Sequence, residues 1–383
     1  MKNSITLLLL VLSTSVFGQS KLFDKVSDLL KANILAEAKI NLAEKPITVT
    51  SFQSERSAGG KHDFFSEGDY WWTDSTNPNG PYIQRDGLTN PDNFTAHRKA
   101  MIRFSKLVAN QTSAYLITGN TIYANQAIAH IKAWLVDTNT IMNPSLLYAQ
   151  AIKGKVTGRG IGIIDMIQMI EVAKSIEVLE KNNLIKPTDS IQIHKWFTNY
   201  LNWVTTHPYG IDERNAKNNH GTCWVMQVSA FAQLVKDTAL LSYCKDRFSK
   251  VIIPNQMDEN GAFPLELKRT KPYGYSLFNV DAVMTIAHIY KITDPTLKKS
   301  IEFMHPYVQD KKSWPYPKDV MYWDEWPVAP IALLFGSIAT NNTGWFDTWN
   351  KLEHFPTNEE VIRNTPIRNP LIWINNSLEK NTK

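Results

Sequence analysis

The stretch WVMQVSAFAQLVKDTAL, residues 224–240, carries the pattern that decides the fold of this chain. Its apolar side chains recur at the spacing of one face of an α-helix. Clusters of Gly, Pro and Asn separate it from the neighbouring segments and are typical of loops. The same period recurs in further segments: 100–117, 122–136, 161–179, 191–204, 277–290, 296–308 and 328–338. The sequence therefore predicts a mainly α protein.

The connections between these helical segments are short. Successive helices joined in this way form antiparallel pairs, so a helical bundle, solenoid or toroid is expected. No fixed repeat length is visible, which does not support a regular repeat family. Residues 45–52, KPITVTSF, alternate apolar and polar side chains and are the best candidate for a strand. No clear linker divides the chain, so residues 19–383 are expected to form a single domain.

The N-terminus has the layout of an export signal. Lys2 is followed by an apolar run from Ile5 to Val11 and then by small residues, which predicts a signal peptide over residues 1–18. The run is much shorter than the roughly 20 apolar residues that span a bilayer, and no later stretch is long enough. We therefore expect an exported protein, periplasmic or secreted, without membrane insertion.

The charge and the cysteine count exclude several classes of protein. The formal charge is +5, and the basic residues are scattered instead of forming the dense runs that bind nucleic acid. A mild positive balance suits an acidic polymer as partner. The two cysteines, Cys223 and Cys244, cannot form a disulfide framework, although a single bridge and two buried free thiols both remain open. We expect a monomer.

Aromatic residues gather in polar stretches rich in Gly, Pro and Asn. The densest are GDYWWTD (68–74), WPYPKD (314–319) and MYWDEWP (321–327). Flat rings beside polar groups are suited to stacking on sugar rings, although most Trp residues are packing anchors. Residues 56–95 show little helical period, and a long irregular segment in a compact domain is usually functional. We expect this segment to form one wall of a cleft.

A first group of polar residues lies just before the helix of residues 224–240. It consists of Asn218, Asn219 and His220. A helix N-terminus offers unpaired N–H groups and favours anions, so these side chains would stand at the mouth of a binding site. An Asn cap with a neighbouring surface His explains the same residues equally well.

A second group lies in DENGAFPLELKRTKPYGYSLFNVDA, residues 258–282. It offers Glu266, Arg269, Tyr273 and Tyr275 just before another apolar helix. A structural Glu–Arg pair with two loop tyrosines is the simpler explanation of this stretch when it is taken by itself.

Taken together, the two stretches resemble a known family. NNHGTCW (218–224), followed by GAFPLELKRT (261–270) and YGYSLFN (273–279), is similar to the alginate lyase family of polysaccharide lyases, the helical-toroid type that includes lyase families five and thirty-eight. EGDYWWTDSTNPNGPYIQRDG (67–87) resembles the entry segment of that family, and GRGIGIIDM (158–166) is a further match. The resemblance extends from about residue 60 to about residue 340.

The resemblance implies an incomplete (α/α) toroid that cleaves a uronate-containing polysaccharide by β-elimination without a metal. Asn219 and His220 match the Asn–His pair of the family, and Arg269 matches its arginine. Tyr275 matches its catalytic tyrosine, because YSLFN stands at the corresponding helix entry. Tyr273 competes for that role, because the spacing from Arg to Tyr is one residue shorter here than in some relatives.

The chemistry of β-elimination agrees with these residue types. The enzyme must remove the C5 proton beside the uronate carboxylate and expel the oxygen at C4. Donors that grip the carboxylate stabilise the negative charge that builds at C5, and each is commonly worth about 3 to 4 kcal/mol. Asn219 can donate an amide hydrogen bond, and Arg269 offers a charged fork that fits a carboxylate.

The elimination also needs an acid and a base. A tyrosine titrates near about pH 10, and Arg269 is expected to lower that value in Tyr275 by stabilising the phenolate. We assign Tyr275 to protonate the leaving oxygen and, in a syn elimination, to remove the C5 proton as well. His220 is the base when the proton lies on the opposite face of the sugar.

Other residues are given supporting roles. Glu266 is expected to orient Arg269, and His207 to be structural. No set of His, Cys, Asp or Glu has the spacing of metal ligands, so no metal or cofactor is expected. The candidates for substrate binding are Tyr70, Trp71, Trp72, Arg85, His97, Arg159, Asn218, Tyr273, Tyr322 and Trp323.

Two other functions remain open. A glycoside hydrolase on a helical barrel would need paired carboxylates, for which the candidates are Asp258, Glu259, Asp324 and Glu325. An exported glycan-binding module would explain the aromatic clusters, but it gives no reason for the four polar residues to occur together. The residues do not distinguish the uronate polymer; alginate or polymannuronate is the first expectation, and glucuronan the second.

Overall fold

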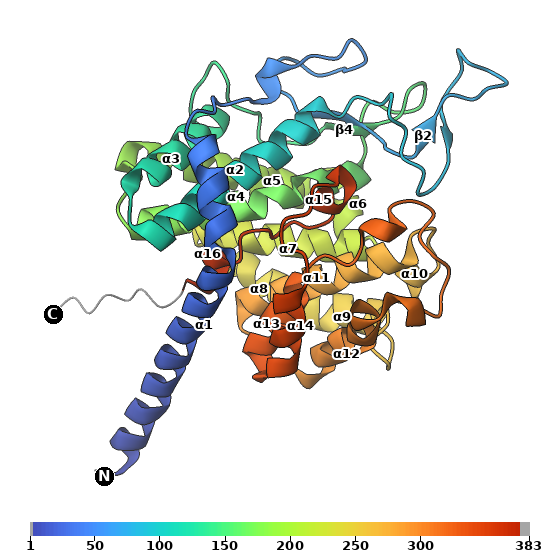
Figure 1. Cartoon of the computed structure of the whole chain (residues 1–383). Coiled ribbons are helices and arrows are strands. Elements are labelled where there is room, and N and C mark those ends of the chain that lie inside the picture. The colour runs from blue at the N-terminus through green and yellow to red at the C-terminus, as the bar shows by residue number, and fades with distance from the viewer. Residues whose placement is uncertain (1–2, 376–383) are drawn as a thin grey trace.

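The computed structural model describes the backbone of residues 3–375 and the side chains of residues 21–375. Helices dominate it and form antiparallel pairs in an incomplete (α/α) toroid (Figure 1), which confirms the predicted fold class. The longer helices are α1 (Asn3–Asn41), α2 (Ala96–Thr118), α3 (Thr121–Leu135), α4 (Met169–Lys181), α5 (Pro187–Thr206), α7 (Asn219–Val235), α8 (Thr238–Arg247), α11 (Pro272–Tyr290), α12 (Pro295–Gln309), α13 (Ile331–Thr340) and α14 (Thr343–Lys351).

Short helical turns connect these helices or extend them. The 3-10 turns are η1 (Val49–Ser51), η2 (Gly160–Gln168), η4 (Lys311–Ser313) and η5 (Trp323–Glu325), and η3 (Phe248–Ile252) is a π-helical turn. The short α-helices are α6 (Pro208–Arg214), α9 (Ile253–Gln256), α10 (Pro264–Leu267), α15 (Glu359–Arg363) and α16 (Leu371–Ile374).

Helices α7 and α11 lie against each other at the centre of the fold. Almost every residue of both is buried, including the polar side chains Gln227 and Asn279. A helix that is surrounded on all sides has no solvent face, so apolar residues occur on every side of both helices. Their N-terminal ends therefore bring Asn219 and Tyr275 to fixed positions.

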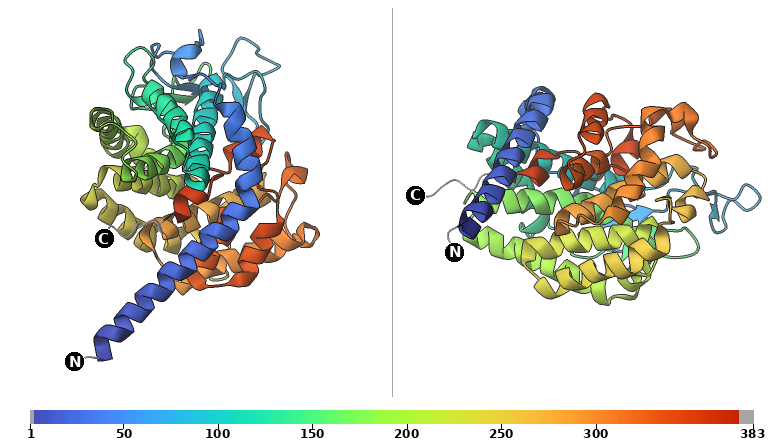
Figure 2. Two further views of the ribbon diagram at one scale, coloured as in Figure 1. Left: turned by 60° about the vertical axis from the view of Figure 1, so that its left-hand side comes forward. Right: turned by 90° about the horizontal axis from the view of Figure 1, so that it is seen from below.

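Helix α1 packs along α2 through its second half, where Val26, Leu30, Ile34 and Ala38 are buried. Its first half extends away from the body in Figure 1 and in the left view of Figure 2. The predicted signal peptide covers this end, with residues 1 and 2 outside the described part, and its cleavage stays a prediction. Within the described residues, no helix combines the length and apolarity that crossing a membrane requires.

The helical segments predicted from the sequence need two adjustments. Residues 224–240 are divided between α7 and α8, because Lys236 ends α7 in the left-handed conformation and Asp237 caps α8 by accepting a bond from the Leu240 N–H. Residues 161–179 begin as the 3-10 turn η2 before α4 starts. Both changes lie at helix ends, where apolar period alone does not fix the boundary.

The strand predicted over residues 45–52 is wrong. Thr48 forms a capping box at the start of η1, and the Ile47 carbonyl accepts the indole N–H of Trp134 at 2.9 Å. These contacts take up the backbone groups that a strand would have needed for pairing. The strands lie elsewhere: β1 (Phe65–Glu67) pairs in parallel with β4 (Tyr148–Ala151), and β2 (Trp71–Trp72) pairs antiparallel with β3 (Ile83–Gln84).

The two cysteines are buried free thiols on α7 and α8. Burial raises the pKa of the Cys244 thiol to about 12 and that of Cys223 well above its usual range. Both therefore act as small apolar side chains in the core, and the single bridge left open by the sequence is not formed.

Two buried histidines predict a loss of stability in mild acid. Burial lowers the pKa of His288 and of His354 to about 4, with Lys174 and Lys291 acting in the same direction on His288. The unfolded chain binds these protons near about pH 6.5, so stability present above that pH is lost as the pH falls toward 4. Between about pH 6.5 and pH 4.5 we expect each histidine to cost about 2 to 3 kcal/mol.

Urea unfolding at about pH 7 and pH 4.5 measures this loss. The variant His288→Gln keeps a side chain able to donate to the Trp373 carbonyl, which His288 contacts through Nε2 at 3.2 Å, and it should lose less stability on acidification than the wild type. An equal loss in the two proteins would contradict the prediction for His288.

Candidate active site

Asn219, His220, Arg269 and Tyr275 line a single cleft. Asn219 and His220 come from the start of α7, Arg269 from the turn between α10 and α11, and Tyr275 from the first turn of α11. The fold thus joins the two stretches that the sequence singles out. The irregular segment 56–95 contributes further lining residues, namely Asp69, Tyr70, Trp71, Gln84 and Asp86.

Glu266 on α10 holds Asn219 in place. Its carboxylate accepts the backbone N–H of Asn219 at 2.7 Å and the side-chain Nδ2 at 3.0 Å. Burial raises the pKa of Glu266, although the bond from Asn219 and the charge of Arg269 oppose this. The expectation that Glu266 orients Arg269 is therefore corrected, since Glu266 bonds Asn219 and closes the open N-terminus of α7.

His220 is held by a buried carboxylate that the sequence analysis did not identify. Glu213 on α6 contacts Nδ1 of His220 through Oε1 at 2.7 Å. Burial raises the pKa of Glu213, and the neighbouring His220 opposes the shift. Because a carboxylate accepts hydrogen bonds, Nδ1 of His220 carries the hydrogen and donates it to Glu213. Nε2 of His220 has no hydrogen bond among the described residues. Nε2 is thus available to accept a proton.

Asp86 orients Arg269. Its carboxylate accepts Nη2 of Arg269 at 2.9 Å and Nε at 3.3 Å, and Thr270 donates to the same carboxylate at 3.0 Å. Burial would lower the pKa of Arg269, but Asp86 and Tyr275 keep it above its usual value. The guanidinium carbon lies 4.6 Å from the ring centroid of Tyr275. Arg269 therefore stands fully charged beside the phenol.

Tyr275 meets Tyr70 across the cleft. Their hydroxyl oxygens are 2.6 Å apart, which joins the irregular segment to the start of α11. Burial raises the pKa of Tyr275 well above its usual range, Tyr70 acts in the same direction, and Arg269 opposes them. The expectation that Arg269 lowers this pKa is corrected, because burial outweighs the nearby cation and the resting side chain is a neutral phenol.

Tyr273 does not face the cleft. It is fully buried, its hydroxyl donates to the Tyr307 carbonyl at 3.0 Å, and its ring packs edge-on against Trp314 and Trp323. Residues two apart on a helix point in different directions, so only one of the two tyrosines can line the cleft. The structure places Tyr275 there, and it places Tyr273, also a candidate for substrate binding, in the core.

Two other candidates for substrate binding are structural. His97 is 4 % exposed; its Nδ1 accepts the Phe65 N–H at 3.0 Å and its Nε2 contacts the Phe52 carbonyl at 3.2 Å. Asn218 lies outside the lining and accepts the Gln256 amide through its own carbonyl at 2.9 Å. The expectation for His97 is therefore corrected, since both of its ring nitrogens are taken inside the protein.

Arg159 and Trp71 line the cleft side by side, with the Arg159 guanidinium 5.8 Å from the Trp71 ring centroid. Arg159 donates to the Gln150 carbonyl at 2.9 Å and to its side chain at 3.0 Å. The glycine before it allows this placement, because a Cβ at Gly158 would lie 1.9 Å from the Leu147 carbonyl oxygen. The GRG motif thus brings a cation against the cleft wall.

The remaining aromatic candidates lie outside the cleft lining. Trp72 donates its indole N–H to the Leu88 carbonyl, and the exposed Arg85 lies over its ring at 5.4 Å. Tyr322 and Trp323 belong to another segment, where Lys311 lies 4.5 Å from the Trp323 ring centroid. The stacking of sugar rings on Trp72, Tyr322 and Trp323 therefore stays a prediction.

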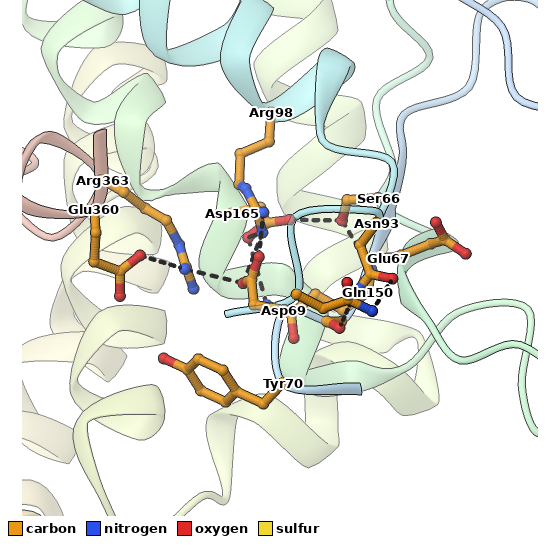
Figure 3. A network of polar contacts seen from close by, with 12 residues as sticks. Ser66, Glu67, Asp69, Tyr70, Asn93, Arg98, Gln150, Asp165, Glu360 and Arg363 are labelled. Carbon is orange, nitrogen blue, oxygen red and sulfur yellow. Dashed lines mark hydrogen bonds and ion pairs between the residues drawn. The ribbon is translucent and has the colours of Figure 1, made fainter. Parts of the chain in front are cut away.

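An ionic network forms part of the cleft wall and continues into the core (Figure 3), since Asp69 and Arg363 line the cleft. Asp69 binds Arg98 from α2 and Arg363 from α15, and Asp165 from η2 binds Ser66 at 2.7 Å. The sequence analysis missed Asp69 and Arg363, as it missed Glu213 and Asp86. Asp86 stands in the RDG motif of residues 85–87, which could have drawn attention to it. No pattern in the sequence connects Arg363, near the C-terminus, with this site.

The paired carboxylates of the hydrolase alternative do not line this cleft. Asp258 and Glu259 lie in the loop after α9, and Asp324 and Glu325 lie in η5. In the part of the chain that the structure describes, no group of three or more His, Cys, Asp or Glu side chains could hold a metal ion.

The chain is similar to proteins of a known family. The family model described as alginate lyase matches residues 48–314. The crystal structure of an alginate lyase from Bacteroides ovatus is similar, with a TM-score of 0.77 and 29% identity over 93% of this chain and 96% of that chain. Comparison with curated proteins found no match.

More distant structures share the fold alone. Alginate lyase A1-III from Sphingomonas species A1 has a TM-score of 0.51 and 12% identity, over 82% of this chain and 88% of that chain. A variant of alginate lyase A1-III complexed with a tetrasaccharide has a TM-score of 0.54 and 12% identity, over 88% and 93% of the two chains. Because the family model spans well over half of the sequence, the chain belongs to the alginate lyase family and is a polysaccharide lyase.

Proposed function

We propose that the protein cleaves a uronate-containing polysaccharide by metal-independent β-elimination and leaves a 4,5-unsaturated uronate at the new chain end. Alginate, in particular polymannuronate, is the first substrate, because the similar structures are of alginate lyases; glucuronan is the second. The observation that carries the proposal is the convergence of Asn219, His220, Arg269 and Tyr275 on one cleft.

The substrate carboxylate binds to Arg269 and Asn219. Arg269 presents a guanidinium whose position Asp86 fixes, and Asn219 presents an amide whose position Glu266 fixes. As the C5–H bond breaks, negative charge moves onto this carboxylate. Donors that are already in place stabilise that charge without reorganising during the reaction, so the protein itself supplies the electrostatic help that a metal gives in other enzymes.

His220 and Tyr275 move the protons. The Nε2 atom of His220 accepts the C5 proton, and Glu213 at Nδ1 stabilises the imidazolium that forms. The C5–H electron pair becomes the C4=C5 bond, the C4–O bond breaks, and the leaving oxygen takes its proton from Tyr275. In a syn elimination Tyr275 itself removes the C5 proton, which requires that it first becomes a phenolate.

Ultraviolet absorbance of the new C4=C5 bond tests the proposal. The purified protein is incubated with polymannuronate, polyguluronate, glucuronan and hyaluronan, each with and without a chelator. We expect absorbance to rise on alginate polymers and to be unaffected by the chelator. New reducing ends without absorbance would indicate hydrolysis, binding without either signal would indicate a glycan-binding module, and loss of activity with the chelator would contradict metal independence.

Glu213→Gln is expected to lower kcat by roughly 100-fold or more, because the amide no longer fixes the His220 tautomer or stabilises the imidazolium. KM should change little, since Glu213 is buried behind His220. Steady-state kinetics on the best polymer measures the effect, with the melting temperature as the check on folding. A folded Glu213→Gln enzyme with full kcat would remove His220 from proton transfer.

Export is part of the same proposal, because a polymeric substrate is met outside the cell. Residues 1–18 are the proposed signal peptide, cleaved near Gly18 or Gln19. N-terminal sequencing of the protein recovered from periplasm or culture medium tests this. A mature chain that still begins at Met1 would contradict it.

A further inference from the structure

The ionic network at the cleft wall is a row of charges that alternate in sign, and all but Arg363 are buried (Figure 3 shows it from Glu360 to Asp165). Glu360 contacts Arg363 at 2.9 Å, Arg363 contacts Asp69 at 2.9 Å, Arg98 donates to Asp69 at 3.0 Å, and Arg98 lies 3.6 Å from Asp165. The row starts at Lys271, whose Nζ lies 2.6 Å from Oε1 of Glu360.

Lys271 connects this row to the tyrosines. It precedes α11 and is 4 % exposed, and its Nζ lies 5.1 Å from the ring centroid of Tyr70 and 5.2 Å from that of Tyr275. The ring of Tyr322 lies at 5.4 Å from the same atom. Burial alone would lower the pKa of Lys271, but Glu360 and Tyr70 keep it above its usual value. The ammonium therefore stays charged among phenol rings.

We propose that Lys271 is a positioning residue for proton transfer by Tyr275: its ammonium, held by Glu360, fixes the Tyr70–Tyr275 pair and stabilises negative charge on that pair during the elimination. The inference rests on the role proposed above for Tyr275. Lys271 lies outside the cleft lining, so it acts on the substrate through the tyrosines.

The chemistry of a buried tyrosine explains why such a cation is needed. Tyr275 gives up its proton to the leaving oxygen, and in a syn elimination it must also exist as a phenolate, yet burial disfavours the charged form. Arg269 supplies one positive charge near the ring, but Asp86 binds it and the substrate carboxylate will share it. Lys271 supplies a second charge, near both phenols, that the substrate does not reach.

The counter-ion of Lys271 comes from a part of the chain outside the family match. Glu360 belongs to α15, whereas the family model ends at residue 314. The ion pair between Lys271 and Glu360 joins α15 to the start of α11, although the two residues lie 89 positions apart in sequence. The segment 359–364 also places Arg363 and Asn364 in the cleft lining. The C-terminal segment is thus a component of the active site.

Two substitutions in Lys271 test the proposal. Lys271→Met is expected to lower kcat at least about 10-fold, to leave KM within about threefold, and to move the basic limb of the kcat–pH profile upward by about one pH unit, because a phenolate loses its neighbouring cation. Lys271→Arg keeps the charge and should restore the pH profile. Lys298→Met removes the cation of an exposed pair with Glu302 and should leave all three measurements unchanged.

The double variant Lys271→Met/Glu360→Gln separates positioning from folding. Lys271→Met leaves Glu360 buried with one partner fewer, which lowers stability. The double variant removes that charge and should recover the melting temperature but not kcat. Because the Glu360 carboxylate raises the pKa of Tyr275, its removal should move the pH profile only part of the way back. If the double variant recovers kcat together with stability, Lys271 is merely structural and the proposal is wrong.

A measurement without substrate distinguishes this inference from the proposed function. Incorporation of 3-fluorotyrosine at position 275 allows fluorine NMR to follow ionisation of that phenol in the resting protein. We expect the midpoint to rise by about one pH unit or more in Lys271→Met, and an unchanged midpoint would overturn the proposal. If no uronate polymer is cleaved, the proposed function fails, and the fluorine titration still decides the influence of Lys271.

Discussion

Tyr275→Phe is expected to abolish measurable turnover, a loss of about 10³- to 10⁴-fold in kcat, while polymer binding stays close to that of the wild type. The substitution removes the hydroxyl that gives the leaving oxygen its proton and keeps the ring that Arg269 and Lys271 flank. Without an acid, the C4 oxygen would leave as an unstable alkoxide. Ultraviolet assays measure turnover, and calorimetry with the inactive variant measures polymer binding.

Tyr273→Phe is the matched control. Its hydroxyl bonds the Tyr307 carbonyl inside the core, so its loss should cost about 1 kcal/mol of stability and leave kcat intact. Retained turnover in Tyr275→Phe would move the acid role to another residue, and a parallel loss in both variants would show that the effect is one of packing.

The helical period predicted a mainly α fold, and the resemblance to the alginate lyase family added the toroid and the four central residues of the site. Apolar period locates helices because each must bury at least one face. In the structure, α7 and α11 are buried on almost every side. Polar residues just before such helices then stand at the ends of the most rigid elements of the molecule. This is why Asn219 and His220, far in sequence from Arg269 and Tyr275, line the same cleft.

The residues whose roles were predicted wrongly have partners that lie far from them in sequence, and a sequence pattern does not show such contacts. Tyr273 and Tyr275 are two positions apart, and only the packing of α11 against η4 and η5 decides which one turns into the core. His97 is a residue type that often binds substrates, but both of its ring nitrogens form hydrogen bonds inside the protein. Nδ1 contacts the Phe65 N–H, and Nε2 contacts the Phe52 carbonyl. Glu266 was assigned to Arg269, three residues along the chain, whereas its side chain bonds Asn219 on another helix.

The electrostatic state of the site was the least predictable part. A cation beside a tyrosine lowers the pKa of the phenol in water, but desolvation by the surrounding core acts in the opposite direction and is larger for Tyr275. Tyr70 from the irregular segment and the carboxylate of Glu360 from α15 raise the pKa of Tyr275 further. Both contributors lie far from residue 275 in sequence.

Arg269→Lys is expected to lower kcat/KM by about 10²- to 10³-fold, although the charge is kept. Lysine has no planar fork, so it cannot donate two parallel bonds to a carboxylate. It would also lose one of the contacts by which Asp86 sets the side-chain direction. A loss of one well-placed donor in the transition state corresponds to about 3 to 4 kcal/mol, and most of it should fall on kcat, because the charge on the carboxylate grows as the C5 proton leaves.

Arg85→Lys provides the comparison for Arg269→Lys. Arg85 is exposed and lies over Trp72 outside the cleft lining, so its replacement should change KM by at most severalfold and leave kcat unaltered. Steady-state kinetics of both variants on one polymer, over a range of salt concentrations, separates the two roles. Screening weakens attraction between exposed charges, so KM of the wild type should rise with salt while the kcat deficit of Arg269→Lys stays constant. An Arg269→Lys enzyme with wild-type kcat would show that positive charge alone suffices, and the carboxylate grip would then belong to Asn219 and His220.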